Sequence, residues 1–398
     1  MPTAAPAAEP QLVLRFVIAA KQTFALLLLG ALPLAILGLI TVKLATGSHT
    51  FDFHTFWFSG RDVLHGRSPY PHSLPAIAHR TVFRPFVYPA PAAVAMVPFA
   101  LIPYGVADLV WLAVGIGAVA GALRLLGVRD WRCYGAAFAS VPVCSALGNG
   151  AISALLVLGL AALWRYRSRP WAAGALLAAL VVFKLYLWPL GIWLLATRRV
   201  RATAYSVAIA AVATAAGWAA IGFAGLREYP HLLDRLTLLV GDQGYAPYAL
   251  FRALGASPGA ARLEMLGAGA LLVAGMIACA LRPGGERAAF ALGVAASLSL
   301  TPIVWPHYLA LVFVPLAVAR PRFGLAWALP MTLWFFTGDW SRGVPSVIGG
   351  TLAVSAAVLC YAIAGPRARR SRRAPSPFGR RAARWATSAG LAGPATWP

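Results

Sequence analysis

Long apolar stretches alternate with short arginine-rich segments along most of the chain. A run of about 20 apolar residues can form a helix that crosses the roughly 30 Å hydrocarbon layer of a bilayer, and a shorter run crosses only if neighbouring residues extend it. On this basis the pattern predicts twelve membrane-crossing helices, at residues 24–46, 104–126, 133–147, 151–164, 170–183, 185–197, 202–224, 260–281, 286–302, 307–319, 323–337 and 344–364.

Composition agrees with this pattern and excludes a soluble globular protein. The 398 residues are 60% hydrophobic and only 11% charged, with a mean hydropathy of +0.73, whereas about a quarter of the residues of a soluble domain are charged. We therefore expect an all-α polytopic membrane protein. Its four cysteines occur singly in or beside apolar runs, so we interpret them as small packing residues and expect no disulfide framework or zinc site.

The charge of the chain is strongly positive, with 34 Lys and Arg against 11 Asp and Glu and a formal charge of +23. Such an excess could indicate nucleic-acid binding, but membrane topology also selects for it, because Lys and Arg collect in cytoplasmic loops. With the N-terminus inside, 23 of the basic and 3 of the acidic residues fall in the alternate segments 1–23, 124–132, 165–169, 198–201, 282–287, 320–322 and 365–398. We expect both termini to be cytoplasmic and no nucleic-acid partner.

This topology divides the chain into three parts. Residues 1–23 are a cytoplasmic segment, residues 24–364 form the membrane domain, and residues 365–398 are a basic tail that is predicted to be disordered. Two extracytoplasmic segments, 47–103 and about 225–259, are too long for simple turns. Long ordered loops in a compact domain are where function usually resides.

The first long extracytoplasmic segment is predicted to carry interfacial helices. In "FDFHTFWFSGRDVLHGRSPY", apolar residues recur at i, i+3, i+4 and i+7 from Phe53, with polar residues on the other face, as in a helix that lies in the membrane surface. The later run "APAAVAMVPFALIP", at residues 90–103, is too short to cross, so we assign it as a re-entrant or interfacial helix buried against protein.

Isolated polar residues stand at the ends of several apolar runs, and the topology places all of them on the outer side. They are Asp52, Asp108, Asn149, Lys184 and His307. A transporter would place such groups near the midplane of the bilayer, where both sides can gain access. Because all five residues are placed on the outer side of the membrane, they favour a reaction or binding site at that interface.

Each of these residues also has a purely structural interpretation. Asp52 could be a helix N-cap or a general base, and with His54 it could form only a weak metal site, so no metal is expected. Lys184 could extend to the outer headgroups or bind a lipid phosphate. His307 follows an aromatic belt and could make an ordinary hydrogen bond. Asn149, in "LGNGAIS", fits a tight turn.

Ordered pieces of the sequence carry a resemblance to a known family. "FDFHTFWFSGRDVLHGRSPY" is followed by "FVYPAPAAVAMVPFALIP", "GNGAIS", "FKLYLWP" and "SLTPIVWPHY". Over most of residues 24–340 the chain resembles glycosyltransferase family 87, whose members are similar to polyprenol-phosphate-mannose-dependent α-1,2-mannosyltransferases. The resemblance implies a GT-C-like bundle of about twelve transmembrane helices in a bacterial cytoplasmic membrane.

The resemblance also implies a reaction. A sugar, expected to be mannose, moves with inversion from a polyprenyl-phosphate donor to a glycolipid or envelope-glycan acceptor on the extracytoplasmic face, without a cofactor. Asp52 would be the general base. The donor phosphate would be bound by Lys184, His307, Arg61 and Arg84, and the substrate pocket would include His54, Trp57, Tyr88, Asn149 and Trp305.

Two other functions remain open on the sequence. A flippase or transporter for polyprenyl-linked glycans would share the apolar composition and the lipid substrate. A non-catalytic partner of an envelope-assembly complex would use the long loops as docking surfaces. The sequence contains no glycine-rich loop between a strand and a helix that could hold a nucleotide sugar, which favours a lipid-linked donor over a soluble one.

Overall fold

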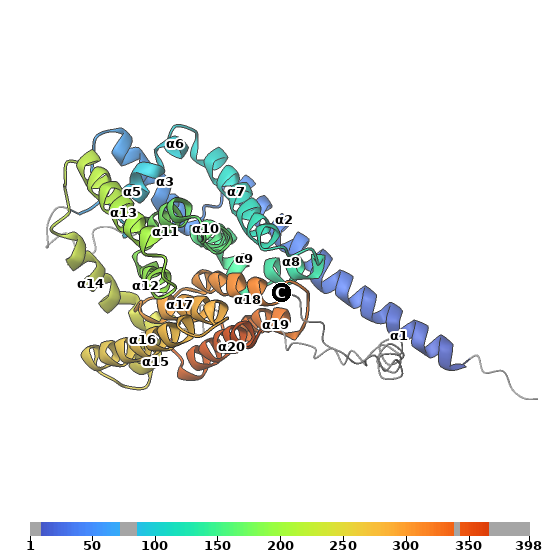
Figure 1. Ribbon diagram of the computed structural model, residues 1–398. Helices are drawn as coiled ribbons and strands as arrows, with labels where there is room; N and C mark the ends of the chain where they lie inside the picture. The colour runs from blue at the N-terminus through green and yellow to red at the C-terminus, as the bar shows by residue number, and fades with distance from the viewer. Residues whose placement is uncertain (1–8, 72–85, 338–342, 366–398) are drawn as a thin grey trace, which may run out of the picture. The chain divides into compact units, whose positions relative to one another are not determined.

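A computed structural model of the chain describes residues 9–71, 86–337 and 343–365. Every regular element within these residues is a helix, as the sequence predicts (Figure 1). Arg84 and the basic tail lie outside the described residues. Outside the two long loops, the longest α-helices are α1 (Glu9–Leu26), which the π-helical turn η1 (Leu27–Ala31) joins to α2 (Leu32–Ala45), and then α7 (Tyr104–Leu125), α10 (Ser153–Tyr166), α11 (Pro170–Phe183), α13 (Val200–Ala220), α16 (Pro258–Ala280), α17 (Glu286–Ser299) and α20 (Pro345–Ala364).

Five of these helical segments are long and apolar enough to cross a membrane. They are Ile18–Ala45, Tyr104–Leu125, Val200–Ala220, Pro258–Ala280 and Pro345–Ala364. Shorter apolar helices cover most of the remaining runs, and their ends follow the sequence pattern closely. The protein is therefore a multi-pass, all-α membrane protein.

One predicted crossing is wrong as a single helix. Residues 133–147 form two eight-residue helices, α8 (Trp131–Phe138) and α9 (Val141–Gly148). The backbone is extended at Ser140, and Pro142 occupies the first turn of α9, where its missing N–H costs nothing. Because each piece extends only about 12 Å, neither spans a bilayer alone.

The run at residues 90–103 also consists of short pieces. It forms α5 (Ala90–Ala95) and α6 (Val97–Ala100), which contact α13 and α3 (Phe51–Leu64), respectively. Ala90, Ala92 and Ala93 are fully buried. A segment this short cannot cross the hydrocarbon layer. Irregular backbone is tolerated at membrane depth only where protein buries it or where it lines a cavity, and this segment is buried against protein.

Helix α3 packs against protein with the face that the sequence pattern suggested for the membrane surface. Phe53 and Phe56 are fully buried, and Trp57 donates from Nε1 to the carbonyl oxygen of Ile102 at 3.2 Å. The approach of α6 is so close that a Cβ at Gly60 would lie 2.7 Å from the backbone of Met96. The apolar periodicity was therefore a signal of tertiary packing.

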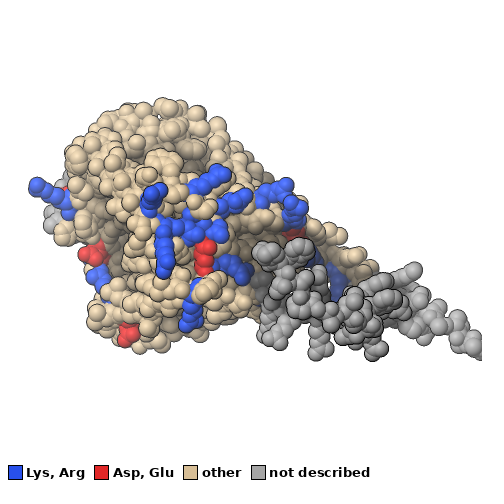
Figure 2. Space-filling view, in the orientation of Figure 1, with Lys and Arg blue, Asp and Glu red and all other residues tan. Residues whose placement is uncertain are grey.

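Segments that were predicted to be cytoplasmic contact one another. Glu286 Oε1 accepts from Arg167 Nε at 2.7 Å and from Arg199 Nη2 at 2.6 Å. Asp130 accepts from the backbone N–H of Phe323, and hydrogen bonds from Arg132 lower the pKa of that carboxyl to about 2. Figure 2 shows basic side chains gathered across the middle of the face in view, with acidic side chains among them.

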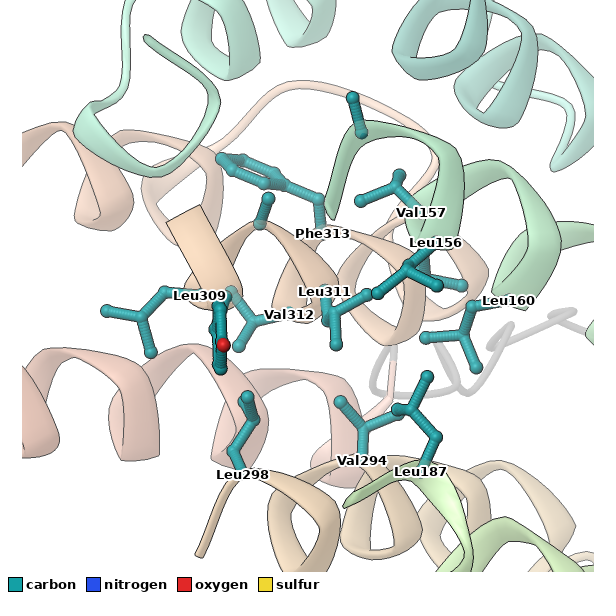
Figure 3. Packing of buried hydrophobic residues seen from close by; sticks show 14 of the residues in the cluster. Leu156, Val157, Leu160, Leu187, Val294, Leu298, Leu309, Leu311, Val312 and Phe313 are labelled. Carbon is teal, nitrogen blue, oxygen red and sulfur yellow. The ribbon is translucent and has the colours of Figure 1, made fainter. Parts of the chain in front are cut away.

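The core of the domain lies where α10, α17 and the 3₁₀ segments η2 (Leu185–Leu187) and η4 (Pro306–Val312) meet. Figure 3 shows their aliphatic side chains interdigitating, with Phe313 of α18 (Phe313–Ala319) beside them. Leu160, Leu187 and Leu311 have no solvent exposure. Since η2 and η4 directly follow Lys184 and Trp305, this packing fixes the backbone that carries two of the candidate residues.

Candidate active site

A cavity of about 610 Å³ opens beside the start of α3. Its wall combines α3, the residues before α5, the α11–η2 junction, α14 (Tyr229–Val240) and the segment that leads into η4. Five of the residues singled out in the sequence line it: Asp52, Tyr88, Lys184, Trp305 and His307. Residues that are far apart in the sequence thus share one space large enough for a small ligand.

Two neighbouring segments hold the start of α3, where Asp52 lies. The Asp52 N–H donates to the carbonyl oxygen of Asn149 at 2.8 Å, and the carboxylate of Asp108 accepts from the N–H and hydroxyl of Thr50 at 3.2 and 2.7 Å. The N-cap of α3 is Thr50. The N-cap interpretation of Asp52 is therefore wrong, and its carboxylate is available to interact with a ligand in the cavity.

Gly150 allows this close arrangement. Its φ is +63°, a conformation that side-chain-bearing residues rarely adopt. A Cβ on Gly150 would lie 2.6 Å from Phe53 Cβ and 2.7 Å from Thr50 Oγ1. The "GNG" turn thus sets the position of the helix that carries Asp52.

The carboxylate of Asp52 points into the cavity without a hydrogen bond to Oδ2 from any described residue. Its side chain is 17% exposed, and His307 Nε2 lies 3.6 Å from Oδ2. Asp52 lies outside the candidate spans. Burial raises the pKa of its carboxyl to about 6, and the positive charge of Lys184 partly opposes the rise. The group can therefore exchange a proton near neutral pH.

Lys184 reaches the cavity because α11 ends immediately before it. Its backbone is extended, with φ −144° and ψ 99°, between α11 and η2. The ammonium donates to the hydroxyl of Tyr308 at 2.6 Å and lies 4.1 Å from the centre of the Tyr88 ring. With a residue exposure of 9%, Lys184 points into the protein. The alternative in which it extends to outer headgroups is therefore wrong.

His307 reaches the cavity from another part of the chain, at the start of η4. Pro306 precedes it and Trp305 is extended, which turns the imidazole toward Asp52. The ring also packs edge-on against Tyr308, with 4.8 Å between ring centres. A carboxylate, an imidazole and an ammonium thus surround one part of the cavity and could exchange a proton with, or balance the charge of, a reacting group.

Comparison with protein families identifies the chain. The family model described as "Glycosyltransferase family 87" matches residues 86–291, just over half of the 398 residues. The chain belongs to glycosyltransferase family 87. Tyr88 and Lys184 lie inside the matched range, whereas Asp52 and His307 lie outside it. No solved structure matches the chain.

Two curated relatives of this family 87 chain bear the same name, polyprenol-phosphate-mannose-dependent alpha-(1-2)-phosphatidylinositol pentamannoside mannosyltransferase. The protein from Mycolicibacterium smegmatis is 26% identical over 333 residues, which cover 79% of this chain and 77% of that protein. The protein from Mycobacterium tuberculosis is 27% identical over 278 residues, which cover 64% of this chain and 59% of that protein.

Several residues predicted for the site of this glycosyltransferase do not line the cavity. Arg61 lies over the Trp57 ring at 5.0 Å and is exposed. His54 packs against Phe58, and Trp57 is bonded to backbone. Asn149 contributes its backbone carbonyl and turns its side-chain amide to Ser145. Arg84 falls outside the described residues. No three His, Cys, Asp or Glu side chains cluster as metal ligands in residues 9–71, 86–337 and 343–365.

Sequence reasoning missed the contribution of α14 and two tyrosines. Tyr186 and Tyr308 line the cavity, and their rings stack with 5.2 Å between centres. Helix α14 adds Arg235 and a row of aliphatic side chains, namely Leu232, Leu233, Leu236, Leu239 and Val240. The i, i+4, i+7 spacing of three of these leucines in the second long loop was the available signal.

Proposed function

We propose that the protein transfers mannose from a polyprenyl-phosphate donor to a glycolipid or envelope-glycan acceptor. The observation that carries the proposal is the Asp52 carboxylate, whose Oδ2 accepts no hydrogen bond from the described residues and faces a cavity shared with Lys184 and His307. The names of the two relatives indicate the donor class, and the site contains groups that could carry out the chemistry.

The reaction that these groups support is an inverting displacement. An acceptor hydroxyl oxygen attacks C1 of the sugar, the bond between C1 and the phosphate oxygen breaks, and polyprenyl phosphate leaves with the electron pair of that bond. Asp52 takes the hydroxyl proton, a role that typically contributes 10²–10⁴-fold. The ammonium of Lys184 balances the charge that grows on the leaving phosphate, and an imidazole N–H of His307 can donate a hydrogen bond to a phosphate oxygen.

The membrane arrangement that we propose places this cavity on the extracytoplasmic side. The chain would cross a bacterial cytoplasmic membrane about twelve times with both termini inside, and residues 90–103 would be re-entrant. Two observations support this side. The contacts around Glu286 join three arginine-rich segments, and the cavity residues Phe183 and Lys184 lie at the other end of α11. An excess of Lys and Arg marks the cytoplasmic side.

Reconstitution of the purified protein tests the proposal. Proteoliposomes that contain radiolabelled polyprenyl-phosphate mannose and extracted envelope glycolipids should yield labelled acceptor and free polyprenyl phosphate. A flippase would move the labelled lipid between leaflets without releasing polyprenyl phosphate. A docking protein would be inert in both assays. Either of these two results would refute the proposed transfer.

A further inference from the structure

Three buried polar atoms without a hydrogen-bond partner among the described residues belong to residues that line the cavity. They are Asp52 Oδ2, Tyr186 Oη and Arg235 Nε. Leaving a buried donor or acceptor unpaired is unfavourable, and a bound ligand is one way to complete the missing bond. Two of the three are donors, so the missing partner includes acceptor oxygens.

Arg235 is the feature that the proposed reaction does not use. Its guanidinium is permanently charged, and no described residue accepts a hydrogen bond from it or pairs with it. The adjacent carboxylate of Asp234 is bonded to Arg262 at 2.9 Å. Lys184, a second cation that lines the cavity, already donates to Tyr308 and interacts with Asp52. Arg235 thus brings to the cavity a positive charge that no described residue balances.

The surroundings of Arg235 restrict the anion that it could bind. Leu232, Leu236 and Leu239 of the same helix line the cavity beside it. Hydrocarbon and a cation next to each other on one wall suit a ligand in which an anionic group is joined to an apolar chain. A guanidinium fits phosphate oxygens especially well, because its N–H groups can donate to two oxygens at once.

We propose that Arg235 binds the phosphate of a lipid-linked substrate and that α14 contacts the first part of its hydrocarbon chain. The inference rests on the proposed function for the statement that this lipid is a substrate, but lipid-phosphate binding can be measured without sugar transfer. The phosphate could belong to the polyprenyl donor or to a phospholipid-anchored acceptor, and the two sources differ in their kinetic effects.

Binding is tested first, with polyprenyl phosphate as the probe and uncharged polyprenol as the reference. Polyprenyl phosphate should raise the melting temperature of the purified wild-type protein, and polyprenol should not. Arg235→Gln should weaken binding of the phosphate about 10- to 100-fold, as expected for loss of a charge-assisted hydrogen bond. Arg235→Lys should recover part of the affinity. Arg227→Gln, a control on an exposed arginine of the same loop that does not line the cavity, should bind like the wild type.

Kinetics then identify the source of the phosphate. A rise confined to the KM for polyprenyl-phosphate mannose assigns Arg235 to the donor. A rise confined to the KM for a phospholipid-anchored acceptor, absent with an acceptor on a neutral anchor, assigns it to the acceptor. Unchanged affinity and KM in Arg235→Gln, or an equal loss in Arg227→Gln, would overturn the inference.

The two proposals can fail separately. If the wild type binds polyprenyl phosphate through Arg235 but transfers no sugar, the proposed function is wrong and the phosphate site stands. If the wild type transfers mannose and Arg235→Gln leaves both KM values and phosphate binding unchanged, the phosphate site is wrong and the enzyme stands.

Discussion

The rate of sugar transfer should depend on pH through the ionisation of Asp52. A general base works when it is unprotonated, and burial raises the pKa of this carboxyl from an ordinary 3.8 to about 6. With a pKa of 6, about 90% of the carboxyl is ionised at pH 7 and about 10% at pH 5. The value of kcat/KM should therefore rise about tenfold between pH 5 and pH 7, with its midpoint near 6.

The perturbation that isolates this group is Asp52→Asn, which keeps the shape of the side chain and removes the base. It should lower kcat by about 10²–10⁴-fold, the usual contribution of a general base, and abolish the inflection near pH 6. Asp62→Asn is a matched control, because Asp62 lies in the last turn of the same helix and is paired with Arg67 at 2.9 Å. That variant should retain wild-type rate and pH dependence.

The assay measures initial rates of label transfer from polyprenyl-phosphate mannose in proteoliposomes buffered between pH 4.5 and 8. Saturating donor and acceptor give kcat, and limiting donor gives kcat/KM. If Asp52→Asn keeps more than a tenth of the activity, or if its residual rate still rises near pH 6, another group accepts the proton and the assignment of Asp52 is wrong.

Three further predictions concern stability. Asp52→Asn should raise the free energy of unfolding at pH 7 by up to about 3 kcal/mol, because folding raises the pKa of Asp52 to about 6 and so disfavours its ionised form. The free energy of unfolding of the wild type should fall by the same amount as the pH rises from 4 to 6. Chemical denaturation of both proteins at pH 4 and pH 7 checks the two signs. Gly150→Ala should lower the free energy of unfolding by about 1–2 kcal/mol through its positive φ alone, which thermal melts measure. It should also lower the rate of sugar transfer, because the added Cβ displaces the start of α3. Glu286→Gln should cost about 1 kcal/mol by leaving Arg167 and Arg199 facing each other, and added salt should reduce the loss in thermal melts.

The helices were predictable wherever an apolar run ends at a strong polar or helix-breaking residue. The predicted spans at 170–183, 260–281 and 344–364 agree with α11, α16 and α20 to within two residues. The run at 133–147 failed because both of its halves are apolar, so the break at Ser140 leaves no mark in the hydrophobic pattern. Pro142 was the available signal, because a proline fits the first turn of a new helix but interrupts the hydrogen bonds of a continuous one.

The polar residues of the cavity differ in how visible they are in the sequence. Lys184 and His307 stand out because they interrupt apolar segments, where a polar group needs a reason. Arg235 lies in a loop that already contains Arg227, Glu228 and Asp234, so its charge is unremarkable there. Only the packing of α14 against the cavity distinguishes it, and that packing depends on contacts between distant segments.

The position of Lys184 reconciles two opposing requirements on Asp52. A carboxylate bonded directly to an ammonium would have a lowered pKa and would be a weak base, whereas one buried among apolar groups alone would stay protonated at neutral pH. Here the ammonium donates to Tyr308 instead, and its charge acts on Asp52 without a hydrogen bond between them. Burial and this attraction leave the pKa near 6, where the carboxyl is ionised at pH 7 and still retains affinity for a proton. Tyr308 therefore helps to set the basicity of Asp52 through the lysine that it holds.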